Sequence, residues 1–492
     1  MSEHQIGQFG SWEIISEDIV RKKCDLSFFK YQGSGLSQKV RWFFKVEGLQ
    51  LGQKQDLVLV YNGVEYEALI RMESSETART RIFWSSLLGQ KFAPYTDDGV
   101  QHILEFHRAG EYRYEIKFVE NADDDTTVSG MAKRKEIIES IKKYIASKGF
   151  TYSDGMIENF YLSLKSKPFV ILAGTSGTGK TKLVELFAEA IGAEYSLVSV
   201  RPDWSDGSDL FGHYDLNGVF IKGPVWEAFD KAIAESNRPV FLCLDEMNLA
   251  RVEYYLSDFL SVIESRKKSD DGKIKTKPIA QIENGIPDNL YFVGTVNMDE
   301  TTFPFSKKVL DRANTIEFNY VELLPDFDTE DTNLEGLSVP NSFLKTGYLV
   351  LTLDCADEKE YVIQICDKLQ QINEILRKAN AHVGYRVRDE IVFYMLNNKK
   401  AENLLTEEQA FDNEIMQKIL PRIQGSSVAI RDMLIELFKF CMGNYSGLNT
   451  DTGKVGEQMK SMADSATYKE SAKKIGYMMT RYEDDGFTSY WL

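Results

Sequence analysis

Residues 174–181 read GTSGTGKT, and this segment decides the fold. It follows the apolar run 168–173 (PFVILA) and opens the stretch 182–191 (KLVELFAEAI), which has helical periodicity. A strand, a glycine-rich loop and a helix in this order form a phosphate-binding loop, in which backbone N–H groups and the helix N-terminus surround an anion. Lys180 reaches the terminal phosphates in such a loop, and the Thr181 hydroxyl ligates Mg²⁺. We therefore expect nucleotide binding by Gly174, Thr175, Ser176, Gly177, Thr178, Gly179, Lys180 and Thr181.

Two further apolar runs end in polar side chains and complete this expected site. The run 239–246 (PVFLCLDE) has the form of a buried parallel strand. Its carboxyl end lies beside the phosphate loop, where Asp245 holds the metal through water and Glu246 acts as general base. The third run, 289–296, precedes Asn297, whose amide orients the attacking water.

Length and composition predict several packed domains. The chain has 492 residues, 43% of them hydrophobic, which is too long for one ordinary domain and too apolar for extensive disorder. No apolar run is long enough to cross a membrane, so we expect a cytoplasmic protein without a membrane partner. The cysteines show no CxxC spacing and fit a reducing compartment; they are Cys24, Cys243, Cys355, Cys366 and Cys441.

The pattern along the chain predicts a division into three regions and a linker. Residues 1–120 read as a β-rich, mixed α+β domain, and 121–132 as an acidic linker. Residues 133–325 read as the α/β nucleotide-binding domain, and 326–492 as a mainly helical region. The strands expected in the first region include 40–46, 56–61, 65–70 and 111–119.

Basic side chains gather at two places in and beside the α/β domain. Residues 305–312 read as a helix that brings Lys307, Lys308 and Arg312 to one edge, where an arginine stabilises transition-state charge at a neighbouring subunit's nucleotide. A lone surface arginine is more often structural, so this role depends on the family. The cluster 266–277 reads as a hairpin tip that faces either a partner or solvent.

These motifs together resemble the AAA+ superfamily and, more narrowly, the McrB family of motor subunits in modification-dependent restriction systems. The blocks that carry the resemblance are 174–182, 201–215, 241–266 and 291–318, together with GFTSYWL at 486–492. The resemblance implies an AAA+ core with a C-terminal helical lid. It also implies a Walker B pair at Asp245 and Glu246, a sensor amide at Asn297 and an arginine finger at Arg312. Arg386 or Arg388 reads either as a second sensor or as part of an ordinary salt bridge at a helix start.

The same resemblance implies a set of substrates and partners. These are GTP in preference to ATP with Mg²⁺ as cofactor, DNA that carries a modified base, a separate McrC-like nuclease and a hexameric ring of this chain. Nothing in residues 174–181 reads the base, so ATP stays open. The net charge of −17 is unfavourable for DNA binding, but the acidity is concentrated towards the C-terminal end.

The first region is the expected DNA-binding domain. Arg79, Arg81 and Trp84 combine cationic and aromatic side chains, as phosphate contact and base stacking require. Trp84 reads equally well as a core residue of a β domain. The rival interpretation is a MoxR-like ATPase that remodels proteins and docks a client on residues 1–120; salt-dependent DNA binding would distinguish the two.

Overall fold

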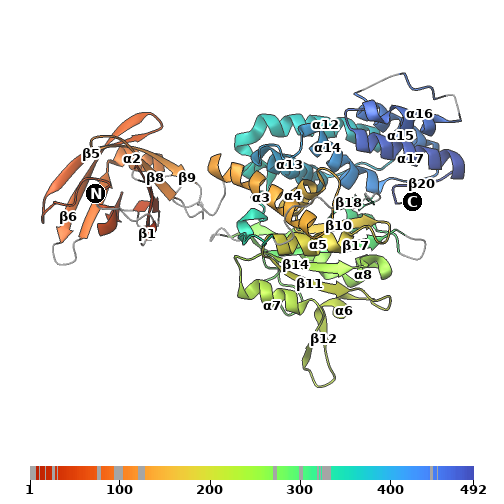
Figure 1. Cartoon of the computed structure of the whole chain (residues 1–492), viewed down its shortest axis with the longest axis horizontal. Coiled ribbons are helices and arrows are strands. Elements are labelled where there is room, and N and C mark those ends of the chain that lie inside the picture. Colours follow the sequence, from red (N-terminus) through yellow and green to blue (C-terminus); the bar gives the residue numbers. More distant parts are fainter. Residues whose placement is uncertain are drawn as a thin grey trace. The chain divides into compact units, whose positions relative to one another are not determined.

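The computed structural model describes residues 7–9, 11–16, 18–24, 28–29, 32–74, 79–92, 103–119, 128–269, 274–298, 303–318, 321, 323, 334–443, 447–450 and 453–491. The chain divides into two compact units, one built on residues 1–126 and a larger one built on residues 127–492 (Figure 1). Most of the predicted linker, residues 121–127, lies outside the described residues. The remainder of it already belongs to helix α3 (Val128–Ser147).

A five-stranded parallel sheet organises the larger unit. Its order is β11–β14–β17–β10–β18, so the first strand in sequence lies between the last two. The predicted α/β core is thereby confirmed, and all strand ends that carry site residues meet at one edge. The strands are β10 (Phe169–Gly174), β11 (Glu194–Ser199), β14 (Val240–Asp245), β17 (Leu290–Asn297) and β18 (Asn314–Phe318).

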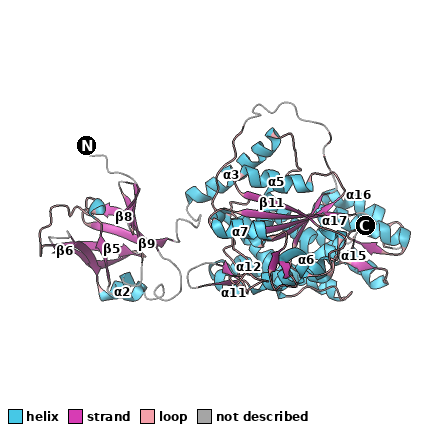
Figure 2. Cartoon of the chain, turned by 90° about the horizontal axis from the view of Figure 1, so that it is seen from below, coloured by secondary structure: helices cyan, strands magenta, loops and turns pink. Residues whose placement is uncertain are grey.

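Successive side chains along the buried strands point to opposite faces of this sheet, and this alternation assigns each face to its helices. Phe169 and Ile171 pack in one core with α7 (Trp226–Ala234), α8 (Val252–Tyr255) and α9 (Ser257–Val262). Val170 and Leu172 pack on the opposite face with α3, α4 (Met156–Ser166) and α5 (Lys180–Ala190). Figure 2 shows this sheet enclosed by helices. A two-stranded hairpin, β12 (Gly212–Tyr214) and β13 (Phe220–Lys222), projects from the unit (Figure 1).

The C-terminal part of the larger unit is helical, as predicted, and we call it the lid. Its core is continuous with that of α4 and α5, so lid and sheet share one hydrophobic interior. None of the helices in the described ranges is long and apolar enough to cross a membrane. The main lid helices are α12 (Lys359–Arg377), α13 (Tyr385–Lys400), α14 (Glu407–Glu414), the π-helix η7 (Ile415–Ile419), α15 (Val428–Cys441), α16 (Val455–Met462) and α17 (Lys469–Asp485).

The lid buries a carboxyl group that titrates far from its usual range. Glu414 is 1% exposed, and burial raises its pKa to about 8. When the pKa of a carboxyl group is higher in the folded state than in the unfolded state, the group stabilises the fold at any pH below its unfolded pKa, here near 4.5. This stabilisation is lost as the pH rises through 8. We expect Glu414→Gln to remove this loss. Between about pH 5 and pH 9, the melting temperature of the wild type should fall relative to that of the variant. Melting temperatures that change with pH in the same way in both proteins would contradict the burial of an ionisable Glu414.

The N-terminal unit is a mixed, nine-stranded sheet wrapped around an aromatic core, and Figure 2 shows it built mostly of strands. This supports the β-rich domain predicted there. The strands, in sheet order, are β1 (Gly7–Phe9), β2 (Trp12–Ser16), β3 (Ile19–Lys23), β8 (Ile103–Gly110), β9 (Arg113–Val119), β5 (Lys54–Tyr61), β6 (Val64–Ser74), β7 (Arg79–Trp84) and β4 (Gly33–Leu36).

One predicted strand of this unit is wrong. Residues 40–46 form turns after the short 3₁₀ helix η1 (Gln38–Val40), although their composition is that of a strand. Phe43 and Phe44 are adjacent in sequence and both fully buried, with ring centroids 5.0 Å apart. A strand would point these neighbours to opposite faces, whereas a tight turn brings both into the core.

Trp84 is a core residue, so its predicted role in DNA binding is wrong. It is 6% exposed and packs on Phe28 and Phe92, with ring centroids 4.5 and 5.8 Å away. Neighbouring residues of a strand face opposite sides, so Phe83 and Arg81 share the outer face while Trp84 points inward. Arg79 begins β7, and its side chain lies outside the described residues.

Substitutions on the two faces of β7 should therefore have different effects. Trp84→Ala removes a buried ring, which costs about 3–5 kcal/mol of unfolding free energy. Arg81→Ala removes a partly exposed side chain and should change stability by about 0.5 kcal/mol or less. Both changes in unfolding free energy are measured by chemical denaturation of the full chain. The denaturation is monitored by circular dichroism, because this signal does not depend on tryptophan fluorescence. Equal stability losses would contradict this assignment of faces.

Candidate nucleotide site

The phosphate loop joins the end of β10 to α5, and two of its glycines are required by close contacts. Gly174 has φ +156°, and a Cβ there would lie 1.9 Å from the Phe318 carbonyl oxygen. Gly179 has φ +85° and lies against Tyr152, whose hydroxyl donates to the Gly179 carbonyl at 3.0 Å. Side chains cannot enter at either position, so the backbone is left free to surround a phosphate.

Lys180 lies inside this loop. It is 5% exposed, and its ammonium group donates to the carbonyl oxygens of Gly174 at 3.0 Å and Thr175 at 2.6 Å. Burial lowers the pKa of Lys180, while the charges of Asp245 and Glu246 act in the opposite direction. A poorly hydrated ammonium group beside a ring of N–H donors suits a phosphate oxygen.

Two hydroxyl groups and one carboxylate meet where β14 ends. Asp245 Oδ1 accepts hydrogen bonds from Thr181 Oγ1 at 2.8 Å and from Thr295 Oγ1 at 2.7 Å. Thr295 lies on β17 two residues before Asn297, and its hydroxyl also accepts from the Glu246 backbone N–H at 3.1 Å. The structure thus brings together Thr181 and Asp245, the two residues predicted to serve the metal.

These oxygens fit a magnesium ion. Mg²⁺ is held in nucleotide sites by one or two protein oxygens, with phosphates and water supplying the rest. A hydroxyl and a carboxylate side by side match that donor set. Within the described ranges, no group of three or more His, Cys, Asp or Glu side chains could hold a metal by itself. When bound, the ion would neutralise charge on the β- and γ-phosphates.

Glu246 and Asn297 form the polar pair next to the metal position. The Asn297 side-chain amide donates to Glu246 Oε1 at 2.7 Å. Glu246 has φ +51° and ψ +47°, a left-handed conformation that is uncommon for a residue with a Cβ. Such backbone strain concentrates at functional sites. The conformation turns the Glu246 carboxylate to Asn297, so the predicted base and the predicted water-orienting amide lie together.

A cleft extends from the phosphate loop between the core and the lid. It is bounded by Thr178 of the loop, the segment 151–156 before α4, strand β18 and the lid helices α14 and α17. A nucleotide whose phosphates occupy the loop would place its base and sugar in this cleft. The cations that line it all belong to α17, and they are Lys469, Lys473, Lys474 and Arg481.

The predicted second sensor does not lie in this cleft. Neither Arg386 nor Arg388 is among the described residues that line it. Arg386 instead forms an ion pair with Glu264, and Arg388 pairs with Asp389 at 2.6 Å. These ion pairs match the expected alternative of a salt bridge at the start of the helix, and a sensor role for either arginine stays a prediction.

Arg312 is not among the described residues that line the cleft either. The predicted helix around it is short, α10 (Lys307–Leu310), and Arg312 follows its end. The Arg312 guanidinium donates from Nε to the Leu260 carbonyl and from Nη1 to the Lys308 carbonyl, both at 2.8 Å. Its side chain is 19% exposed. Lys307 and Lys308 are exposed, as predicted for an edge of the domain.

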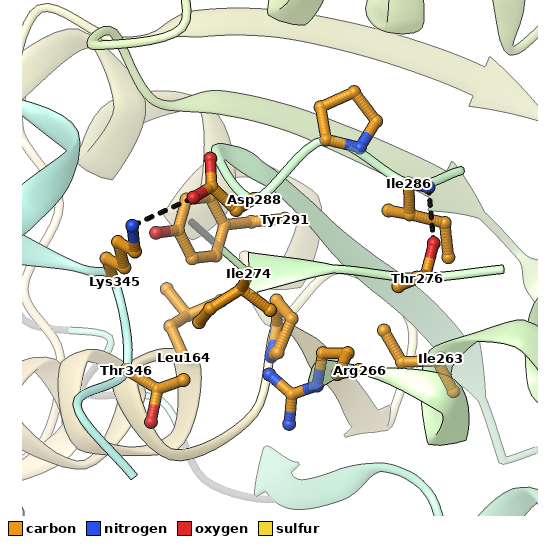
Figure 3. A pocket seen from close by; sticks show the side chains of 12 residues that line it. Leu164, Ile263, Arg266, Ile274, Thr276, Ile286, Asp288, Tyr291, Lys345 and Thr346 are labelled. Carbon is orange, nitrogen blue, oxygen red and sulfur yellow. Dashed lines mark hydrogen bonds and ion pairs between the residues drawn. The ribbon is translucent and has the colours of Figure 1, made fainter. Parts of the chain in front are cut away.

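A second, smaller pocket lies near the β15–β16 hairpin (Lys267–Lys268 and Ile274–Lys275), which occupies part of the predicted basic hairpin tip. Figure 3 shows its lining, in which apolar side chains such as Leu164 and Ile274 are mixed with polar ones such as Arg266 and Tyr291. At its edge Lys345 pairs with Asp288 at 2.9 Å. The pocket lacks the backbone N–H cradle of the phosphate loop, and we assign it no part in nucleotide binding.

Sequence reasoning missed three side chains, two at the nucleotide site and one that connects the core to the lid. Thr295 binds Asp245, Tyr152 supports Gly179, and Glu264 holds Arg386. Thr295 could have been found, because it precedes Asn297 by two residues and therefore points the same way from β17. Tyr152 and Glu264 carry no such signal, since their partners are distant in sequence.

Comparison with known proteins identifies the core. Residues 169–313 match the AAA domain of the dynein-related subfamily, and residues 336–487 match a domain of unknown function (DUF8727). The chain therefore carries an AAA domain, which supports nucleotide hydrolysis. The narrower resemblance to the McrB family, and with it the preference for GTP, gains no support from these matches.

The chain is also similar to one curated protein and to one solved structure. The Chaperone MoxR1 of Mycobacterium tuberculosis is 31% identical over 128 residues, which is 25% of this chain and 31% of the relative. The match thus spans about a third of the relative's length. A "putative ATPase" from Cytophaga hutchinsonii superposes with a TM-score of 0.38 at 18% identity, over 59% of this chain and 88% of that one. The second likeness is too loose to refine the fold.

Proposed function

We propose that this chain is a Mg²⁺-dependent AAA+ ATPase that remodels protein clients. The observation that carries the hydrolytic part is the paired geometry at the strand ends. Thr181 contacts Asp245 at 2.8 Å, and Asn297 contacts Glu246 at 2.7 Å. One pair suits the metal, and the other suits the attacking water of an in-line phosphoryl transfer.

Different residues of the chain perform the separate steps of hydrolysis. Lys180 and the loop N–H groups bind the phosphates, and Glu246 accepts the proton of the water that attacks the γ-phosphate. Asn297 holds Glu246 and orients that water. Arg312 follows a helix at an edge of the domain, and we propose that it acts on the nucleotide of an adjoining copy in a ring, with six subunits as the expected number.

Exposed apolar side chains support a protein client. They gather on the β12–β13 hairpin, where Leu216 is fully exposed and Tyr214, Val219 and Ile221 are 57%, 59% and 47% exposed. Asp215 stiffens the hairpin, because its Oδ1 accepts from Asn217 N at 2.9 Å and Val219 N at 2.8 Å. Exposed apolar patches mark sites of protein contact. The 31% identity to a chaperone over 128 residues is consistent with a protein client.

Hydrolysis by the purified full chain tests the proposal. Phosphate release should require Mg²⁺, rise with protein concentration as copies assemble, and favour ATP over GTP in competition. An unfolded protein should stimulate it. Leu216→Ser should abolish that stimulation and keep basal hydrolysis, because Leu216 lies outside the nucleotide site. A chain that releases no phosphate at any concentration would refute the hydrolytic assignment.

A DNA-driven restriction motor with a McrC-like nuclease partner is the second candidate, and one observation favours it. Arg71 and Arg81 are paired across β6 and β7, and both guanidinium groups lie over the Phe83 ring, at 5.4 and 5.2 Å. An outward aromatic ring between two cations suits phosphate contact and base stacking. Trp84 no longer belongs to this set.

Binding of the full chain to methylated and unmodified duplexes distinguishes the two candidates. The restriction candidate requires affinity that falls steeply with salt and is lost in Arg71→Ala/Arg81→Ala. It also requires DNA to stimulate hydrolysis. We expect neither effect, and a strong, modification-dependent stimulation would replace the remodelling proposal with the restriction one.

A further inference from the structure

The loop that carries Arg312 is fixed by its own core and by the lid. Within the core, two backbone carbonyl groups accept from the Arg312 guanidinium, as described above. From the lid, Arg422 pairs with Asp311 at 3.0 Å, and Lys418 donates to the Ala313 carbonyl at 2.7 Å. The residue before Arg312 and the residue after it are therefore both held by lid cations.

Glu264 connects Arg312 to the lid more directly. It lies in the short 3₁₀ helix η4 (Ile263–Ser265) at the end of α9. Its Oε1 is 2.7 Å from Lys167 Nζ and 4.0 Å from Arg312 Nε, and its Oε2 pairs with Arg386 of α13. Burial alone would raise the pKa of Glu264, but the charge of Lys167 holds it below the usual value. The carboxylate is thus ionised at neutral pH.

A second ion pair fixes the same turn of α13. Glu390 follows Arg386 by four residues and pairs with Lys167 of the core and Lys418 of η7. All three side chains are at most 8% exposed. Burial would raise the pKa of Glu390, yet the two lysines lower it to about 2. Buried charges that each meet a partner give a defined position, because any displacement leaves a charge unpaired.

We propose that Glu264 is a positioning residue that holds Arg312 of the core and Arg386 of the lid as one unit, so that lid position determines where Arg312 is presented to an adjoining copy. This rests on the proposed function, in which Arg312 acts between subunits. Glu264 is not among the described residues that line the cleft. It acts through the two arginines, and displacement of a catalytic cation by about 1 Å can cost about 100-fold in rate.

A double-mutant cycle on turnover tests this role in the assembled full chain with ATP and Mg²⁺. Arg312→Ala should lower kcat by about 10³-fold, the lower range for an arginine finger. Glu264→Gln should lower kcat by about 10- to 100-fold with KM unchanged. The double variant should be no slower than Arg312→Ala, because Glu264 has nothing left to position. Glu264→Asp keeps the charge and should restore part of the loss.

Asp288→Asn is the matched control. It breaks the ion pair with Lys345, and Asp288 is 14% exposed against 21% for Glu264. We expect it to lower thermal stability as Glu264→Gln does while kcat stays at the wild-type value.

Two results would overturn the positioning role alone. One is an unchanged kcat in Glu264→Gln, and the other is a double variant whose loss is the product of the two single losses. Wild-type protein without hydrolysis would instead refute the proposed function, and the role of Glu264 would fall with it.

Discussion

Glu246→Gln should bind nucleotide as the wild type does and lose about 10²–10⁴-fold in turnover, the usual contribution of a general base. Glutamine has nearly the same shape, so it can keep its contact with Asn297, which lies 2.7 Å from Glu246 Oε1. It cannot accept a proton from the attacking water. The affinity should be measured with a fluorescent ATP analogue and the turnover as phosphate release, both in the presence of Mg²⁺.

Glu227→Gln is the control for this substitution. Glu227 lies on the surface of α7, where its side chain is 71% exposed and pairs with Lys231 at 2.9 Å. The same chemical change there should leave turnover at the wild-type level. If Glu246→Gln retained more than about a tenth of wild-type turnover, Glu246 would not be the base.

The sequence could predict those parts of the site whose reactive side chains lie within one contiguous loop or directly at the end of an apolar strand. The phosphate loop is contiguous, so its turn residues, its lysine and its hydroxyl group come in a fixed order. Asp245 and Asn297 each end an apolar run, and parallel strands bring such ends to one edge. Each of these predictions needed only the strand period and the rule for parallel sheets.

The parts that sequence could not predict depend on contacts between distant segments. Arg312 was expected to project from an edge, but carbonyl groups of Leu260 and Lys308 hold it against its own core. Arg386 was expected either at the nucleotide or in a salt bridge, and its partner, Glu264, lies 122 residues earlier in the chain. Whether an arginine meets a carboxylate or a phosphate depends on tertiary packing, which leaves no periodic signal.

Trp84 shows a different reason for failure. Composition placed it with Arg81 as a basic and aromatic cluster, but residues an odd number apart on a strand point to opposite faces. The strand period, applied to 79–84, separates Trp84 from Arg81 on the amino-acid sequence alone. Composition also misled at residues 40–46, where an apolar run with high strand propensity forms turns.

Lys180→Ala should weaken nucleotide binding by about 10- to 100-fold, because a charge-assisted hydrogen bond contributes about 1.5–3 kcal/mol. The ammonium group lies within the loop, held by carbonyl oxygens at 2.6 and 3.0 Å, so it is already placed for a phosphate. Titration with a fluorescent ATP analogue measures the affinity, and thermal unfolding without nucleotide measures any damage to the loop.

Lys182→Ala separates the role of Lys180 from a general loss of positive charge. Lys182 lies two residues further along α5 and pairs with Glu185 at 3.0 Å on the surface. We expect its removal to change affinity by about 2-fold or less, because exposed ion pairs contribute little and solvent screens the charge. Since both variants lose one positive charge from the same helix, only a difference in geometry can separate their affinities. Equal affinities would place the phosphates away from Lys180 and exclude residues 174–181 as the nucleotide site.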